Sequence, residues 1–188
     1  APTPAPTVAP YAAPGGSSFS YDFGGFSPAW VDAAGVAAFT RRMGGTPSRT
    51  TGPSVGPNGA TSYYYYAETS GESPGQLFEL DYVSECPVVA SITFQYNMYG
   101  RTMGTLKVTT SDGADVWSLS GDQGNAWHQA TVAVGAASFS FKYERGSSYT
   151  GDAAIGDVTV YCGSGAGGGS SGTGGTGGGG APAPTAAP

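Results

Sequence analysis

The sequence predicts an all-β domain, an antiparallel jelly-roll β-sandwich, and three observations support this fold class. Apolar residues alternate with polar ones over short runs, Gly or Asp-Gly pairs separate the runs, and no window carries a helical stripe. The clearest run is Ser91 to Tyr99, in which Ile92, Phe94, Tyr96 and Met98 fall on one face. Such strands are typical of two sheets around one core, with about nine to eleven strands and little helix.

The same period of two recurs along the rest of the chain. It places apolar side chains on one face at Leu106 and Val108, at Val132 and Val134, at Phe139, Phe141 and Tyr143, and at Val158 and Val160. Asp112-Gly113 fits a hairpin turn, and Gly151-Asp152 fits a turn before the last strand. We expect Trp117 and Trp127, on either side of a Gly-closed turn, to fill the core.

Low-complexity segments flank this region and divide the chain into three parts. Five of the first fourteen residues are proline, set among Ala and Thr, which favours an extended path. Twelve of the eighteen residues 163–180 are glycine, which favours a flexible coil. We therefore assign 1–18 to a Pro/Ala/Thr-rich linker, 19–162 to the β-sandwich domain and 163–188 to a Gly-rich and then Pro/Ala/Thr-rich linker, with disordered or extended termini.

The charge balance excludes one class of partner. Lys and Arg number 7 against 13 Asp and Glu, for a net charge of -6, which is the wrong sign for a phosphate backbone, so nucleic acid is not an expected partner. The sequence has neither an apolar run of membrane-spanning length nor the pattern of a secretory signal. We expect no direct membrane insertion of this fragment, and a mature or excised piece if the protein is secreted.

The two cysteines predict a secreted environment. Cys86 and Cys162 each stand at the edge of a strand-like run, and an even count in a chain of this composition favours a disulfide over two free thiols. A bridge between them would close a long loop and contribute about 4 to 5 kcal/mol by the chain-entropy relation. Such a bond requires an oxidising compartment, so the expected location is extracellular or the cell surface.

A series of motifs, taken in order, resembles the MAM family, the extracellular module named for meprins, a neuronal antigen and receptor-type phosphatases. The matching runs are Phe39 to Ser54, Tyr63 to Ser70, Cys86 to Thr105, Trp117 to Val132 and Glu144 to Val158. Together they cover most of residues 19–162. The resemblance implies a jelly roll of two antiparallel sheets, with Cys86 bonded to Cys162 in the last strand.

The chain also departs from the family pattern at its N-terminal end. Residues 21–30 carry no cysteine where the family has an earlier pair, so the first strand must be held by packing alone. Some family members bind a cation through acidic groups, and here those positions retain Asp157, with Asp152 and Asp22 as further candidate ligands. Calcium prefers six to eight oxygen ligands, so this set is short of charge and we expect no cofactor, with calcium bound by these acids as the alternative.

The run Tyr63 to Tyr66 is the candidate ligand surface. Alternation exposes two of the four rings and buries the others, so Tyr63 and Tyr65 are the candidates for contact with sugar or protein. Cross-strand pairing of tyrosines is also an ordinary way to stabilise a sheet, and this structural alternative stays open.

No catalytic constellation is visible in the sequence. The single histidine, His128, has no acid or nucleophile at a distinctive spacing, and Glu68, Glu72, Glu79, Glu85 and Glu144 are scattered. Two carboxylates facing each other in a cleft within about 10 Å would instead indicate a glycosidase. We therefore expect no enzyme.

The expected function is a non-catalytic extracellular interaction module for adhesion or assembly, as the resemblance to the MAM family implies. Its partner would be another protein or a second copy, and the spacers would place it in a multi-domain surface or matrix protein, itself membrane-associated. The alternative is a carbohydrate-binding module of a secreted or wall-associated protein, with a glycan bound on exposed aromatic rings. A third hypothesis is a structural subunit of a matrix or surface filament.

Overall fold

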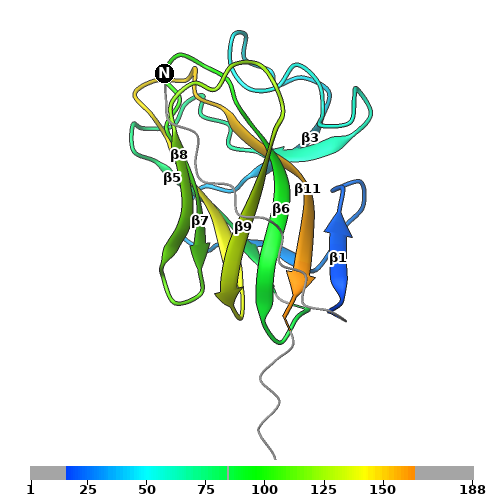
Figure 1. The fold of residues 1–188 in the computed structure, drawn as a ribbon. Helices are drawn as coiled ribbons and strands as arrows, with labels where there is room; N and C mark the ends of the chain where they lie inside the picture. The colour runs from blue at the N-terminus through cyan, green and yellow to red at the C-terminus, as the bar shows by residue number, and fades with distance from the viewer. Residues whose placement is uncertain (1–15, 84, 164–188) are drawn as a thin grey trace, which may run out of the picture.

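The computed structural model describes residues 16–83 and 85–163, which form two antiparallel sheets packed face to face (Figure 1). Within these residues there are eleven strands and no helix, which confirms the predicted sandwich. The strands are β1 (Ser18–Tyr21), β2 (Trp30–Asp32), β3 (Thr40–Met43), β4 (Tyr63–Tyr66), β5 (Leu77–Tyr82), β6 (Val89–Met98), β7 (Thr105–Thr110), β8 (Asp115–Ser120), β9 (His128–Ala136), β10 (Phe139–Glu144) and β11 (Ala153–Cys162). The expectation of disordered or extended termini falls almost entirely outside the described residues.

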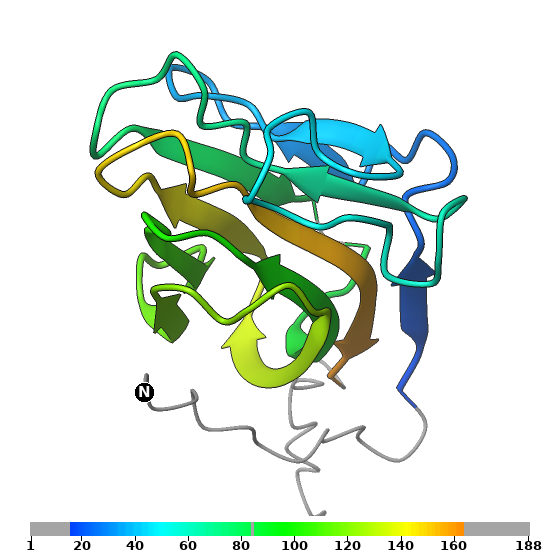
Figure 2. The same cartoon turned by 90° about the horizontal axis from the view of Figure 1, so that it is seen from above.

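The larger sheet has the strand order β3-β4-β11-β6-β9, and β1 pairs with β11 beside β4. The smaller sheet has the order β2-β5-β10-β7-β8. Seen from above, β1 lies beside the C-terminal half of β11, at the margin of the larger sheet (Figure 2). The described part of the chain contains no helix that could cross a membrane.

The core lies between the sheets and is rich in aromatic rings. Phe94 of β6 meets Trp117 of β8 at 5.3 Å and Phe141 of β10 at 4.9 Å between ring centroids. Both contacts are edge-to-face, the arrangement that aromatic quadrupoles favour. The alternation read from the sequence therefore points its apolar side chains inward, as predicted.

One core assignment was wrong. Trp117 is buried in the core, but Trp127 packs on the outer surface of the larger sheet against Tyr64 and donates its indole N–H to the carbonyl of Val55 at 2.8 Å. The physical reason is that Trp127 precedes β9 instead of lying within it, so the alternation of the strand does not apply to it. The inner tryptophan on the N-terminal side is Trp30 of β2.

A β-bulge in β11 separates its two neighbours on one edge. Ala154 and Ile155 pair with β4, whereas the residues from Val158 onward pair with β1. The irregularity falls between Gly156 and Thr159, and it contains Asp157 with a positive φ of 46°. Because an extra residue at a bulge turns the strand, Asp157 points to the outer face at the junction of β1, β4 and β11.

The predicted disulfide is present. Cys86, ahead of β6, is bonded to Cys162 at the end of β11, with their Cα atoms 5.3 Å apart. At the N-terminal end, where the family's earlier pair is missing, the ring of Tyr21 meets Trp30 at 5.4 Å and Phe23 meets Trp30 at 5.5 Å. Aromatic packing thus fixes the segment that follows β1.

Candidate functional site

A polar groove of about 480 Å³ lies on the outer face of the larger sheet. Its walls are the end of β1, the bulge of β11, the inner strand β6 and the edge strand β9. The lining residues are Ser20, Tyr21, Asp22, Thr93, Gln95, Gln129, Asp157, Val158 and Thr159. We call this the β1–β11 groove.

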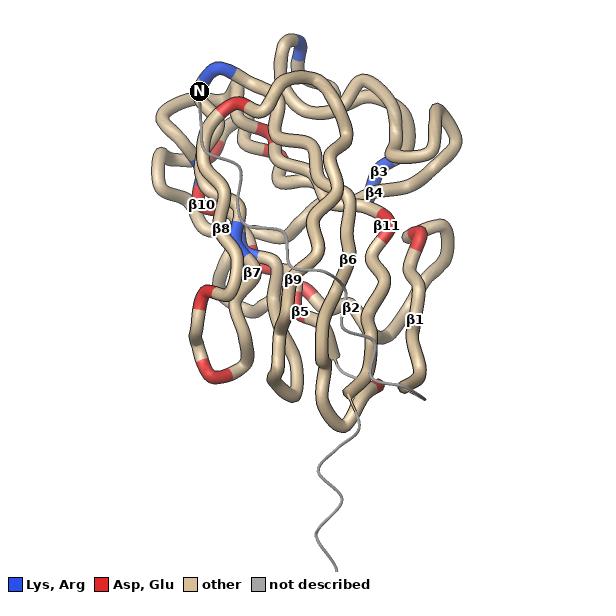
Figure 3. The backbone as a smooth tube through the Cα atoms, in the orientation of Figure 1, with Lys and Arg blue, Asp and Glu red and all other residues tan. Residues whose placement is uncertain are grey.

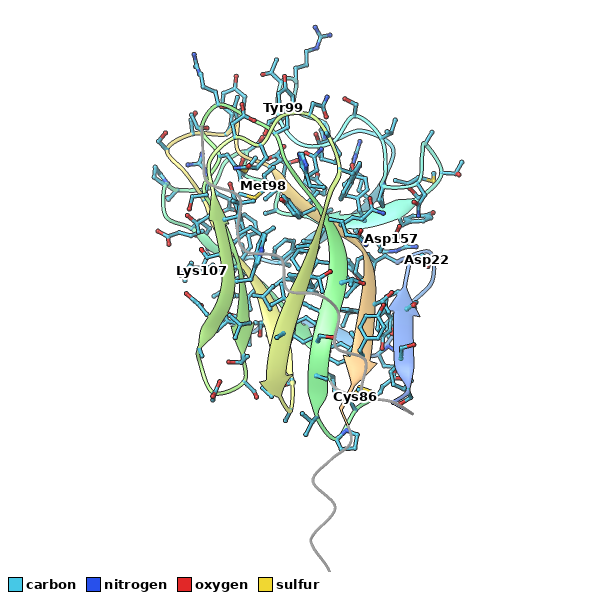
Figure 4. All side chains as sticks on the ribbon, viewed as in Figure 1. Asp22, Cys86, Met98, Tyr99, Lys107 and Asp157 are labelled. Carbon is cyan, nitrogen blue, oxygen red and sulfur yellow. A yellow bond between two sulfur atoms is a disulfide. The ribbon has the colours of Figure 1, made fainter. Side chains whose placement is uncertain are left out.

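Asp157 is held on one rim of the β1–β11 groove by two amides. Its Oδ2 atom accepts a hydrogen bond from Gln95 at 2.9 Å and another from the side chain of Asn58. Figure 4 shows Asp157 close to Asp22, where β11 faces β1. The left-handed backbone of Asp157 costs of order 1 kcal/mol or more, which the surrounding hydrogen bonds offset.

Asp22 stands on the other rim. Its Oδ1 atom accepts a hydrogen bond from the backbone of Gly24 at 2.8 Å, which closes a tight turn. Arg41 fixes the same turn from the other side, because its guanidinium donates to the carbonyls of Phe23 and Gly24, both at 2.6 Å. The position of Asp22 is therefore set by the sequence of the loop and by a cation from β3.

The three predicted metal ligands do not come together. Asp22 and Asp157 share the β1–β11 groove, but Asp152 is completely buried elsewhere, where it accepts hydrogen bonds from Thr69. Over the described ranges 16–83 and 85–163, no group of three His, Cys, Asp or Glu side chains could hold a metal ion. Two carboxylates, one of them already engaged by amides, do not fit a calcium site of six to eight oxygens.

The candidate ligand surface of Tyr63 and Tyr65 is largely occupied. Both rings are half-buried against the main core, while Tyr64 and Tyr66 are buried on the opposite face. The guanidinium of Arg41 lies 3.8 Å from the centroid of Tyr63, and Tyr65 meets Phe23 edge-to-face at 4.9 Å. Tyr63 and Tyr65 therefore both pack against neighbouring side chains, which is the structural alternative that the sequence left open.

An exposed aromatic loop adjoins the β1–β11 groove. Phe26, between β1 and β2, is 94% exposed. It borders a second hollow of about 220 Å³, whose walls include Tyr21, Phe23, Trp30 and Tyr65. We call this region the Phe26 loop.

The described residues bring no catalytic triad together at His128. Its Nε2 atom lies 3.1 Å from the carbonyl of Gln123, and its ring stacks on Tyr96 with centroids 5.4 Å apart. These contacts give the ring a structural environment. Asp22 and Asp157 are the carboxylates that share a groove, and their described hydrogen-bond partners are amide donors.

Sequence reasoning missed the amides and hydroxyls of the groove and the Phe26 loop. Thr93 and Gln95 stood on the polar face of the run Ser91 to Tyr99, so alternation alone placed them outward. Their convergence with Asp22 depends on the pairing of β1 with β11, which has no local signal. Phe26 lies in a Gly- and Pro-rich stretch that gives no periodic pattern.

The architecture defines a class of protein, a two-sheet β-sandwich with a polar outer face and loop-borne aromatic residues. Among solved structures, the K1 cleaved adhesin domain of Lys-gingipain from Porphyromonas gingivalis W83 superposes with a TM-score of 0.56 at 16% identity. The match covers 79% of this chain and 100% of that domain. At this identity the likeness shows the fold alone.

The sequence profile of the MAM domain, meprin/A5/mu, matches residues 22–164, and the chain therefore belongs to the MAM family. MAM domain-containing glycosylphosphatidylinositol anchor protein 1 of Homo sapiens is 36% identical over 128 residues, which is 60% of this chain and 13% of that protein. MAM domain-containing protein 2 of Mus musculus is 31% identical over 141 residues, which is 70% of this chain and 21% of that protein. The chain thus spans less than a quarter of either relative.

MAM domains are extracellular, adhesion-type modules that mediate protein interactions, and this chain is such a module, located outside the cell or at its surface. The bond between Cys86 and Cys162 agrees with an oxidising location. The predicted family and the predicted fold of the chain are both confirmed.

Proposed function

We propose that this domain is a non-catalytic adhesion or assembly module whose principal partner is a protein, either a second copy or another surface protein. The observation that carries the proposal is the Phe26 loop. A phenyl ring that is 94% exposed leaves its apolar surface in water, and burial of that surface in a complex would stabilise the complex. Buried aromatic anchors contribute much of the binding energy at protein interfaces.

The Phe26 loop is also fixed before any partner arrives. The turn at Asp22 and Gly24, the hydrogen bonds from Arg41 and the packing of Phe23 on Trp30 all hold its base. A prefixed loop loses little conformational entropy on binding. The adjacent aromatic hollow offers a receiving site for an apolar side chain of the partner.

The module requires neither a catalytic group nor a cofactor in this proposal. The acidic side chains named as metal ligands are divided between the groove and the interior, so a bound ion has too few oxygens to hold it. Adhesion then proceeds in the absence of calcium. In a larger surface or matrix protein, the flanking segments would set the reach of the module.

The experiment is light scattering of the full chain across a concentration series, with and without calcium and with and without a reducing agent. Phe26→Ala is compared with Tyr149→Ala, which removes another exposed aromatic ring, 53% exposed, from a different loop. Self-association that is lost only in Phe26→Ala supports a second copy as partner.

A chain that stays monomeric is next tested for binding to cells that display surface proteins. Cell binding that Phe26→Ala abolishes and Tyr149→Ala preserves supports a different protein as partner. Equal behaviour of the two variants in both assays contradicts the proposal.

Glycan recognition is the second candidate function. One observation favours it, the β1–β11 groove, whose lining is rich in side-chain amides and hydroxyls.

A further inference from the structure

The β1–β11 groove has a distinctive chemical composition. Its lining contains two carboxylates, two primary amides and three aliphatic hydroxyls, and no Lys, Arg or His. The strands behind it are also uncharged, because β6 and β9 contain no Asp, Glu, Lys or Arg (Figure 3). Its volume of about 480 Å³ falls in the range of small-ligand sites.

We propose that the β1–β11 groove binds a neutral pyranose sugar at the end of a glycan chain. The proposal rests on the second candidate function and names its site and ligand class. Sugar hydroxyls both donate and accept hydrogen bonds, so they match a mixed set of carboxylates, amides and hydroxyls.

Much of the hydrogen-bonding capacity of the groove is unused within the described residues. Oδ2 of Asp22 and Oδ1 of Asp157 accept no hydrogen bond there, since the contacts of both residues go to the other oxygen. The side chains of Thr93 and Gln129 likewise have no hydrogen-bond partner among these residues. All four groups are available to a ligand.

The sheet arranges these groups as a grid. Thr159 lies opposite Thr93, and Gln95 lies opposite Gln129, in register across β11, β6 and β9. Neighbouring strands are about 4.8 Å apart and successive outward residues about 7 Å apart, so the grid places polar groups at the spacing of several hydroxyls on one or two sugar rings.

An aromatic ring lies on the same face beside the grid. Tyr161 follows Thr159 by two residues on β11, so both side chains point outward, and Tyr161 is half-buried. Its ring has no aromatic partner among the described residues. An amphipathic ring in this position can pack against the C–H face of a pyranose, as aromatic side chains do at sites that are partly wet.

Other ligand classes fit less well. An anionic sugar would meet two carboxylates and no cation in the lining. A metal ion would find too few oxygens, because Asp157 already accepts two amide hydrogen bonds. An extended peptide could not add to the sheet at the floor of the groove, since β6 and β11 have strand neighbours on both edges.

The rims of the groove are fixed at a cost in backbone energy. Phe23 and Asp157 are two of the three non-glycine residues with positive φ in the described ranges, at 58° and 46°. Such conformations are strained for residues other than glycine, and together they set the two carboxylates before any ligand binds. Fixed polar groups favour binding because little side-chain entropy is lost.

The test applies the full chain to an array of mannose-, galactose-, glucose- and N-acetylhexosamine-terminated glycans, with sialylated and sulfated glycans on the same array. The methyl glycoside of the best sugar is then titrated by calorimetry into the wild type, Thr93→Val and Gln129→Ala. The control is Gln76→Ala, which makes the same change as Gln129→Ala in a loop outside the groove. Neither groove variant breaks a hydrogen bond within the described protein, so both should fold.

We expect the wild type to bind a neutral sugar, both groove variants to raise Kd about tenfold, and Gln76→Ala to match the wild type. Three outcomes would overturn the proposal: the wild type binds no neutral sugar, it binds anionic glycans alone, or the groove variants bind the neutral sugar as tightly as the wild type does. Release of reducing sugar from a bound oligosaccharide would contradict a non-catalytic site. Because light scattering of the sugar-free chain tests the protein partner, the two proposals can fail independently.

Discussion

Thr69 holds one carboxylate oxygen of Asp152 with both its backbone amide, at 3.0 Å, and its hydroxyl, at 2.8 Å. The other oxygen of Asp152, Oδ2, is buried without a hydrogen-bond partner among the residues that the structure describes. Arg145 joins the same cluster by donating to the carbonyl of Thr69 at 3.0 Å. The cluster thus ties the ends of β4 and β10 to the start of β11.

This arrangement predicts a pH-dependent stability. Burial raises the pKa of Asp152 from 3.8 to about 6, so the folded protein binds more protons than the unfolded chain between these values. The contribution of Asp152 to the unfolding free energy is therefore fully present at low pH and is lost as the pH rises through about 6. The difference amounts to about 2 to 3 kcal/mol.

The measurement is urea unfolding of the wild type and Asp152→Asn at several pH values. The amide of Asn can still accept from Thr69 but does not titrate, so the variant should lack this part of the pH dependence. Glu72→Gln, at an exposed position whose side chain has no hydrogen bond or ion pair among the described residues, serves as the control. Parallel pH curves for the wild type and Asp152→Asn would show that Asp152 has an ordinary pKa.

The disulfide should supply a large share of the stability. The bond between Cys86 and Cys162 spans 76 positions, and the chain-entropy relation gives about 4 to 5 kcal/mol for such a loop. The double variant Cys86→Ser, Cys162→Ser should lower the urea midpoint accordingly, and so should a reducing agent added to the wild type. A change below about 1 kcal/mol would mean that packing alone holds these ends together.

Phe23 should act as the anchor that replaces the family's missing cysteine pair. Phe23→Ala removes a buried ring from Trp30 and Tyr65 and should cost about 3 kcal/mol or more. Phe26→Ala changes the same residue type three positions on, where the ring is exposed, and should be nearly neutral. Hydrogen exchange of the β1 amides should rise only in Phe23→Ala, and equal exchange in both variants would refute the anchor.

Gly104 occupies a position that admits no side chain. A Cβ atom there would lie 1.9 Å from the carbonyl oxygen of Glu144, so Gly104→Ala must displace backbone and should destabilise the domain by several kcal/mol. At Gly25 a Cβ meets nothing within 4 Å, and Gly25→Ala should be neutral or slightly stabilising. Thermal unfolding of the two variants checks the contrast, and similar midpoints would argue against the close approach at Gly104.

The sequence was a good guide to the strands and a poor one to the convergence of side chains. Alternation in Ser91 to Tyr99 is a local property, and β6 forms as expected with Phe94 inward and Gln95 outward. The neighbourhood of Asp22 and Asp157 depends on long-range strand pairing and on a bulge, neither of which has a local pattern. The groove could therefore be described only from the fold.

Burial was the other property that the sequence did not reveal. Asp152 follows a glycine and fitted a turn. Its backbone amide donates to the hydroxyl of Thr51, and its buried carboxylate accepts hydrogen bonds from Thr69. Trp127 was expected in the core as a framework residue, yet the loop carbonyl of Val55 satisfies its indole N–H on the outer face. Both residues stand in loops, whose contacts no periodicity encodes.

The pairing of β1 with the end of β11 has a mechanical consequence. Ser17 and Cys162 meet through a backbone hydrogen bond of 2.9 Å at one end of the sandwich, and the two strands run antiparallel from there. We expect tension applied to the chain on both sides of the domain to load this bond first and then to separate β1 from β11 one residue pair at a time. The packed ring of Phe23 should resist further separation, and the disulfide ties the end of β11 to Cys86. The domain should then lengthen by one short strand under a weak pull and keep its two sheets closed.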